Sequence, residues 1–186
     1  MRAATQVACV VDVLRRAHFH VDVASVEPST SVTLARGLRV TADALIGDVS
    51  AQVYDCVALP GGMPGAERLR DSAALATLLR AQVAEGRWVA AICAAPAVVL
   101  AGPGLVPAHA QMTCHAAFAD ALGGARGDIA RRVVVDAERK LITSRGPGSA
   151  LEWAIELVTQ LGGGALAAEV AKPMHMHGAD VRSVLE

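Results

Sequence analysis

Cys93 is the residue whose type and surroundings most strongly suggest chemistry in this sequence. It follows an apolar run, Trp88–Ile92, that is typical of a buried strand in a parallel sheet. Two alanines and Pro96 then open a second apolar run at helical spacing, and proline is well tolerated in the first turn of a helix. The pattern predicts a strand–turn–helix corner with a cysteine at its tip, the geometry of a nucleophile elbow.

Such a corner favours the thiolate form of the cysteine. The unpaired N–H groups and the positive dipole end of the following helix point at the sulfur and stabilise negative charge there. The small residues on either side of Cys93 suit a strained turn that must expose a nucleophile. The alternative is a structural cysteine that ends a core strand, because unpaired cysteines are among the most buried residues.

A glycine pair at the end of another predicted strand is a second candidate group. Gly61 and Gly62 follow the apolar run Tyr54–Leu59. Because glycine lacks a Cβ, their N–H groups can approach the elbow closely. With the N–H of Ala94 they would form an oxyanion hole, a set of donors for a negatively charged oxygen. The alternative is a plain tight turn.

His115 is the third candidate and follows a short predicted strand, Gln111–Thr113. Cysteine–histidine pairs are common in nucleophilic catalysis, so His115 would orient or deprotonate Cys93. The alternative is a surface histidine at a strand end. Cys114 is interpreted as structural, because successive residues of a strand point to opposite sides.

Two further stretches carry weaker signals. His175 and His177 would chelate a metal if extended, but a mobile tail is the favoured interpretation and no metal site is predicted. The run Arg145–Gly148 would either bind an anion at the helix that follows or simply set the start of that helix.

The elements that position these groups alternate between strands and helices. Besides the elbow, strands are predicted over Phe19–Val26, Tyr54–Leu59, Gln111–Thr113, Arg131–Asp136 and Lys140–Ser144, with a hairpin over Ser31–Asp43 that turns at Arg36-Gly37. Helices are predicted over Val7–Ala17, Ser72–Glu85, Phe118–Leu122, Ser149–Leu161 and Ala165–Val170. This alternation predicts an α/β fold whose sheet is open, parallel and covered on both faces. In such folds the site lies beyond the carboxyl ends of the strands, where all three candidate groups fall.

Length and composition set the limits of this interpretation. The 186 residues, 53% of them apolar and 19% charged, predict one folded domain over residues 1–186. A net charge of −1 gives no electrostatic case for nucleic acid or membrane partners. The four cysteines form no CxxC pair, so neither zinc nor disulfides are expected, no cofactor is predicted, and a reduced cytoplasmic setting is favoured.

Four motifs, in order, resemble the ThiJ/PfpI superfamily and most closely its DJ-one/YajL-like branch. They are Leu59–Gly62, Ala90–Pro96, Thr113–His115 and Thr143–Gly148, and Asp12–Ala17 is a further match. The resemblance covers essentially the whole chain. It implies a flavodoxin-like three-layer sandwich and a homodimer.

The resemblance also implies a function. It implies an oxidisable Cys93 with His115 nearby and the Gly62 and Ala94 amides over it. Arg16 and Arg36 are candidate anion contacts. Family members are described as glyoxalases that convert methylglyoxal to lactate without glutathione, as deglycases, or as oxidative-stress and chaperone-like proteins. Small reactive aldehydes or glycated groups are therefore the expected partners, and a non-enzymatic redox sensor is the alternative.

The sequence departs from the family pattern at its start. The family opens with an apolar strand and a glutamate whose carboxyl contacts the cysteine, whereas Gln6 stands at that position here. The strand normally lies between those around Val23 and Val57, and its loss would leave backbone groups unpaired. Either the native protein is longer, or this variant has lost the acid. Glutamine can donate a hydrogen bond to a thiolate, but it cannot shuttle a proton.

Overall fold

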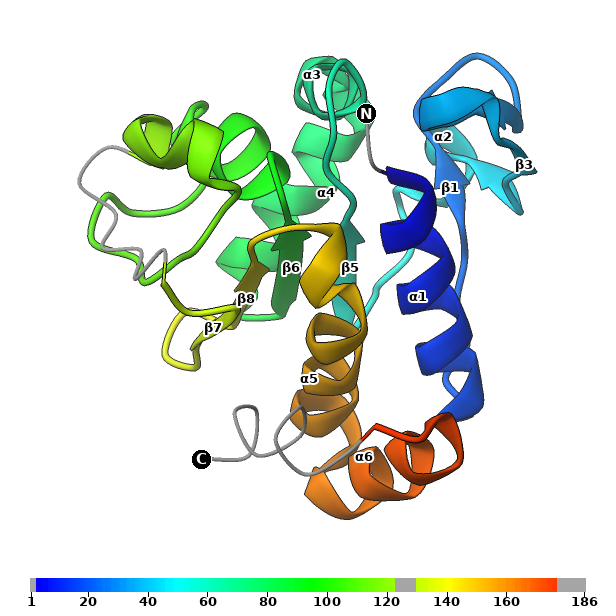
Figure 1. Ribbon diagram of the computed structural model, residues 1–186. Coiled ribbons are helices and arrows are strands. Elements are labelled where there is room, and N and C mark those ends of the chain that lie inside the picture. The colour runs from blue at the N-terminus through cyan, green and yellow to red at the C-terminus, as the bar shows by residue number, and fades with distance from the viewer. Residues whose placement is uncertain (1–2, 123–129, 177–186) are drawn as a thin grey trace.

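A four-stranded sheet forms the centre of the computed structural model, which describes residues 3–122 and 130–176 (Figure 1). The strand order is β5-β6-β8-β7, in which β5, β6 and β8 are parallel and β7 is antiparallel to β8. These strands are β5 (Cys56–Leu59), β6 (Trp88–Ile92), β7 (Val133–Asp136) and β8 (Leu141–Ser144). The mostly parallel sheet confirms the predicted α/β class.

Helices cover both faces of this sheet and complete three layers. They are α1 (Ala3–Arg16), α2 (Ile46–Val49), α3 (Gly65–Asp71), α4 (Ala73–Ala84), α5 (Ala150–Gly162) and α6 (Gly164–Ala171). Figure 1 shows α5 in front of the sheet, α1 to the right of α5, and α4 behind the sheet. Side chains of α1, α5 and α6 pack in one apolar cluster, and those of α3 and α4 pack in a second one.

The remaining strands form two small sheets of their own. The strands β1 (Ala24–Ser25) and β4 (Ala44–Leu45) pair in parallel. The strands β2 (Ser31–Thr33) and β3 (Arg39–Thr41) form the predicted hairpin, whose turn is the short helix η1 (Ala35–Gly37). Neither small sheet is hydrogen-bonded to β5.

Local sequence explains most of the boundaries. Ser72 caps α4 as predicted, its hydroxyl oxygen accepting a hydrogen bond from the N–H of Leu75 at 3.3 Å. Gly86 ends that helix with a φ of +62°, a conformation that glycine adopts without strain. The long helix after Ser149 was also predicted. None of the helices in the described ranges is long and apolar enough to cross a membrane.

Three predicted elements differ from the structure. The strand expected over Phe19–Val26 is reduced to the two residues of β1, because only there does the chain pair with β4. Gln111–Thr113 forms no strand and is held by side chains instead. The helix after the elbow, η2 (Pro96–Ala101), is a π-helix of six residues, and η3 (Ala116–Leu122), η4 (Pro147–Ser149) and η5 (Lys172–Met174) are short 3-10 helices.

Candidate active site

Cys93 lies at the predicted elbow, directly after β6. Its φ is +67°, a left-handed conformation that is uncommon for any residue other than glycine and that stores backbone strain. Its N–H donates to the carbonyl of Ser144 at 2.9 Å, and its carbonyl accepts from the N–H of His115 at 2.8 Å. The residue is only 4% exposed. The elbow is therefore held on both sides by backbone hydrogen bonds.

Gly61 packs directly against this corner. A Cβ added at Gly61 would lie 2.7 Å from the Cβ of Cys93 and 2.8 Å from the nitrogen of Ala94. No side chain fits at that distance, so only glycine allows the end of β5 to approach the elbow this closely. The glycine pair therefore does more than form a tight turn.

The N–H of Gly61 is already occupied, because it donates to Oε1 of Gln6 at 2.7 Å. Gly61 would have to give up this bond to act as an oxyanion donor, and that role stays a prediction. The N–H groups of Gly62 and Ala94 have no acceptor among the described residues. Gly62 has a φ of +94°, which again requires glycine.

Gln6 is a fully buried polar side chain in the first half of α1. Its bond to Gly61 fixes the orientation of the amide, since the reverse orientation would set two donors against each other. The other end, Nε2, is buried and has no hydrogen-bond partner among residues 3–122 and 130–176. An unsatisfied buried donor costs about 1–3 kcal/mol, so this amide is suited to an acceptor that arrives with a ligand or a modification.

His115 is half-buried and is placed beside the elbow by its backbone bond to Cys93. Its Nδ1 accepts from the N–H of Ala117 at 3.2 Å. A neutral imidazole in this arrangement carries its proton on Nε2, so it presents a donor there. The ring packs edge-on against Phe118, and an added Cβ at Gly146 would lie 3.8 Å from its Cδ2.

The other cysteines are poor candidates for a thiolate. Burial raises the pKa of Cys56 to about 12, with the charge of Asp55 adding to the effect, and burial next to Asp12 also raises the pKa of Cys9. Burial, with a smaller contribution from Cys93, raises the pKa of Cys114 to about 11. Cys114 packs in the apolar cluster of α3 and α4, whereas Cys93 packs in that of α1 and α5. The structural role expected for Cys114 stays a prediction.

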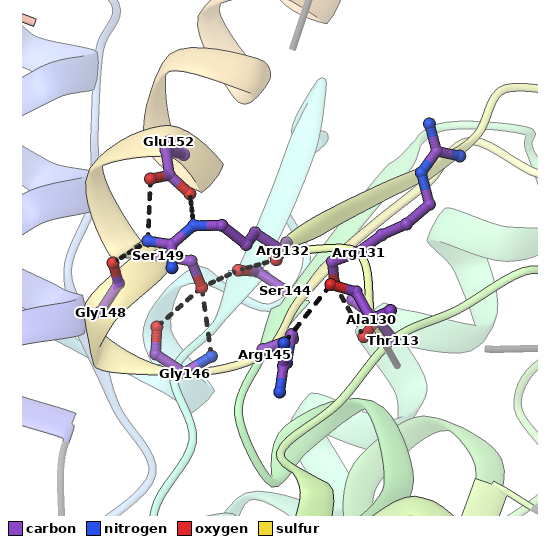
Figure 2. Close-up of polar contacts among 10 residues, drawn as sticks. All are labelled: Thr113, Ala130, Arg131, Arg132, Ser144, Arg145, Gly146, Gly148, Ser149 and Glu152. Carbon is purple, nitrogen blue, oxygen red and sulfur yellow. Dashed lines mark hydrogen bonds and ion pairs between the residues drawn. The ribbon is translucent and has the colours of Figure 1, made fainter. Parts of the chain in front are cut away.

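A polar network missed by the sequence analysis supports the loop beside His115 (Figure 2). The hydroxyls of Ser144 and Ser149 lie 2.7 Å apart, and Ser149 also bonds to Gly146. Arg132 binds Glu152 through two hydrogen bonds, of 2.6 and 2.8 Å. The sequence indicates the two strands and the serine at the start of the helix. It does not indicate that Ser149 meets Ser144 or that Arg132 meets Glu152.

The run Arg145–Gly148 lies in the same loop. Its polar groups bind one another and the start of α5, and Arg132 also donates to the carbonyl of Gly148. These contacts favour the interpretation that the run sets the beginning of the helix α5.

The two arginines that are candidate anion contacts, Arg16 and Arg36, lie away from the elbow. Arg16 is at the far end of α1 from Gln6, roughly 15 Å along the helix axis, and pairs with Asp12 at 2.8 Å. Arg36 lies in the turn of the exposed β2–β3 hairpin with a φ of +65°. Their contact with an anion stays a prediction.

No group of three or more histidine, cysteine, aspartate or glutamate side chains in the described ranges is placed to hold a metal ion. His175 is exposed. His177 lies outside the described residues.

Comparison with known proteins decides the family. The family model described as "DJ-1/PfpI family" matches residues 4–160 of the chain. The chain belongs to the DJ-1/PfpI family. The resemblance stated from the four motifs and the flavodoxin-like fold are thereby confirmed.

Individual DJ-1/PfpI members show the extent of the similarity. Oxidized DJ-1 of Toxoplasma gondii superposes with a TM-score of 0.87 at 43% identity, covering 91% of this chain and 90% of that one. The glutathione-independent glyoxalase DJR-1.2 of Caenorhabditis elegans is 36% identical over 81% of this chain and 76% of its own length. Protein DJ-1 homolog B of Arabidopsis thaliana is 39% identical over 89% of this chain, which spans only 37% of the plant protein.

Proposed function

We propose that this DJ-1/PfpI member is a cysteine-dependent enzyme of carbonyl stress that acts on methylglyoxal or on early glycation adducts. The observation that carries the proposal is the strained elbow at Cys93, with a φ of +67°, packed against Gly61. Strain of this kind persists where a side chain must be presented to a reactant. A relative from Caenorhabditis elegans is named a glutathione-independent glyoxalase.

The first step is addition of the Cys93 thiolate to the aldehyde carbon. A carbon–sulfur bond forms, and the carbonyl electron pair moves to oxygen to give a hemithioacetal. The N–H groups of Gly62 and Ala94, which bind nothing else among the described residues, would stabilise the developing oxyanion. The Nε2–H of His115 would supply the proton to that oxygen.

The second step moves a proton between the two adjacent carbons of methylglyoxal. The aldehyde carbon loses its hydrogen and the neighbouring carbon gains one, which leaves a lactoyl thioester on Cys93. Water then cleaves the carbon–sulfur bond, so methylglyoxal plus one water gives lactate and the restored thiol. Gln6 cannot carry this proton because an amide does not ionise near neutral pH. Water or His115 must carry it, and we expect slow turnover.

Lactate formation from methylglyoxal tests this function. Wild-type protein is expected to form lactate without added glutathione, and Cys93→Ser is expected to form none. Cys9→Ser serves as the matched control, because Cys9 lies on α1, and it should retain the activity. Absence of lactate from folded wild-type protein, or equal rates from Cys93→Ser, would contradict the proposal.

A second candidate function is redox sensing by Cys93, and the orphan amide of Gln6 favours it. Two molecules of peroxide would oxidise the thiolate first to a sulfenate and then to a sulfinate, each step releasing one water. The added oxygens are acceptors, and Nε2 of Gln6 is a buried donor without a partner in the described part of the chain. The other end of the same amide binds Gly61, which packs against Cys93. Oxidation would thus satisfy a group that the reduced site leaves unsatisfied.

Intact-mass measurement after mild peroxide treatment tests the sensor. The expected product gains two oxygens, and peptide mapping should place both on Cys93. Equal oxidation of all four cysteines would argue against a sensor. A product with only one added oxygen, formed alike by wild-type protein and by Gln6→Leu, would also argue against it.

We further propose that the chain works as a homodimer, as its family resemblance implies. We also propose a cytoplasmic setting, which the four cysteines without a CxxC pair favour. The net charge of −1 supports neither nucleic acid nor an anionic membrane as a partner. Sedimentation equilibrium of the purified protein would measure the assembly state directly, and a monomer at micromolar concentration would refute the dimer.

A further inference from the structure

Gln6 presents an unsatisfied donor next to the reactive cysteine. Its side chain is fully buried, and Nε2 has no hydrogen-bond partner among the described residues, Cys93 included. The sulfur is therefore not the acceptor of this amide, although glutamine can donate to a thiolate. A buried donor without a partner costs stability, so its presence here indicates an acceptor that arrives from outside the chain.

The position of this donor follows from the other end of the same amide. Oε1 of Gln6 accepts from the N–H of Gly61 at 2.7 Å, and Nε2 is bonded to the same carbon as Oε1. Gly61 in turn packs so closely against the elbow that an added Cβ would lie 2.7 Å from that of Cys93. The donor of Gln6 and the elbow therefore belong to one small buried region.

The backbone contributes further donors to this region. The N–H groups of Gly62 and Ala94 have no acceptor in the described part of the chain. The buried carboxylates of the described residues all have partners of their own elsewhere; they are Asp136, Glu152 and Glu156. The region thus offers several donors and no buried carboxylate, which suits an anion with several acceptor oxygens.

We propose that this site binds aldehydes that carry a carboxylate on the neighbouring carbon, as reversible adducts of Cys93. Glyoxylate is the smallest such compound, and it suits a cysteine that is only 4% exposed. Its carboxylate would accept from Nε2 of Gln6, and its aldehyde oxygen would accept from the N–H groups of Gly62 and Ala94. The inference rests on the first step of the proposed function, the addition of the thiolate to an aldehyde.

Charge makes a carboxylate the preferred acceptor for Gln6. The amide is itself uncharged, so it sets no like charge against the ligand, and it supplies a donor. A hydrogen bond to a charged acceptor is roughly twice as strong as one between neutral groups. The carboxylate of glyoxylate should therefore bind better at this point than the neutral ketone oxygen of methylglyoxal.

The adduct forms by the same addition as the methylglyoxal adduct but goes no further. The carbon–sulfur bond forms, the carbonyl electron pair moves to oxygen, and the Nε2–H of His115 supplies the proton. The neighbouring carbon of glyoxylate is already a carboxylate, so it cannot gain a hydrogen as the ketone carbon of methylglyoxal does. The hemithioacetal can therefore only dissociate again, and glyoxylate competes with methylglyoxal for the site.

NMR of isotope-labelled glyoxylate tests the inference on the full chain. The labelled aldehyde carbon should give the signal of a carbon bonded to sulfur with wild-type protein and not with Cys93→Ser. Acetaldehyde labelled at its aldehyde carbon is the matched probe, because a methyl group replaces the carboxylate. Mercaptoethanol in water gives the ratio of the two dissociation constants for a thiol without a binding site.

The contribution of the site is the change in this ratio. Wild-type protein should prefer glyoxylate over acetaldehyde at least about tenfold more than mercaptoethanol does, since a hydrogen bond to a charged group is worth about that factor. Gln6→Met removes the donor at similar volume and should lose this preference, with a melting curve to show that it folds. If the variant does not fold, the comparison of wild-type protein with mercaptoethanol decides.

Three results would overturn the inference. They are the absence of a glyoxylate adduct on folded wild-type protein, a ratio equal to that of mercaptoethanol, and an unchanged ratio in folded Gln6→Met. The last result would show that Gln6 does not meet the carboxylate.

The lactate assay separates this inference from the proposed function. Lactate from methylglyoxal without a glyoxylate adduct would overturn the inference and leave the proposed function intact. A glyoxylate adduct with the expected ratio but no lactate would support the inference and contradict the proposed proton transfer between carbons.

Discussion

Oε1 of Gln6 accepts a 2.7 Å hydrogen bond from the N–H of Gly61, which joins the first half of α1 to the carboxyl end of β5. The two residues are 55 positions apart in the sequence, and both are buried. This contact fixes which polar atom of Gln6 remains unsatisfied, and it holds Gly61 against the elbow.

Replacing Gly61 by alanine should disturb the elbow directly. The added Cβ would fall 2.7 Å from that of Cys93, so β5 or the elbow must shift, and we expect a loss of about 1–3 kcal/mol in the free energy of unfolding. Urea denaturation measures the change. Gly65→Ala is the control, because an added Cβ there has open space and lies in a helix. Equal stability of the two variants would contradict the close contact.

Gln6→Glu should increase the rate of lactate formation. The carboxylate can still accept the N–H of Gly61, and it supplies an ionisable group that the amide lacks. Proton transfer by a positioned side chain contributes roughly 10²–10⁴-fold, so a gain of at least about tenfold is expected in the steady-state rate.

Gln6→Leu provides the comparison for this gain. It removes the acceptor of the Gly61 N–H and supplies no acid, so it should leave the lactate rate low and reduce stability. If Gln6→Glu folds normally and its rate equals that of Gln6→Leu, the position of Gln6 is not that of the proton carrier.

Glu156 should make stability depend on pH. Burial raises its pKa from 4.5 to about 7, although a 2.7 Å hydrogen bond from Gln160 opposes the shift. Between these two pKa values the folded protein holds a proton that the unfolded chain has released. This contribution to stability is therefore greatest at acidic pH and is lost as the pH rises toward 7, by up to about 3 kcal/mol.

Denaturation of wild-type protein and Glu156→Gln across pH 5 to 8 isolates this effect, because other titrating groups contribute equally to both. The difference in unfolding free energy between the two should grow with pH in favour of the variant. A constant difference across the range would show that the carboxyl is not protonated in the folded protein.

Ser149→Ala should loosen the loop that lies beside His115. The Ser149 hydroxyl is buried and bonds to Ser144 and Gly146, so its removal should cost about 1–3 kcal/mol. Thermal unfolding measures the loss, and the His115 ring signals in an NMR spectrum should shift. Ser31→Ala, an exposed change in the β2–β3 hairpin, should alter neither measurement.

The sequence was most informative where short local patterns decide the structure. The apolar run before Cys93, the serine cap of α4 and the Arg36-Gly37 turn each depend on residues within a few positions, and all three were predicted. Long-range partners were not predictable in the same way. Nothing near Gln6 in the sequence indicates Gly61, and nothing near Ser144 indicates the hydroxyl that it meets.

The misjudged elements have physical reasons. Residues 19–26 alternate as a strand should, but only Ala24 and Ser25 pair with β4. Residues 111–113 are fixed by Asp136 and Thr143 side chains, so they need no strand ladder.

The central claim is that Cys93 is the nucleophile among four cysteines, and limited alkylation tests it most directly. Protein exposed briefly to iodoacetamide at pH 7 would be digested, and the modified fraction of each cysteine measured by mass spectrometry. We predict that Cys93 is modified first, well ahead of Cys9, Cys56 and Cys114, whose pKa values are raised by burial. Modification of Cys93 no faster than that of the other three would contradict the account.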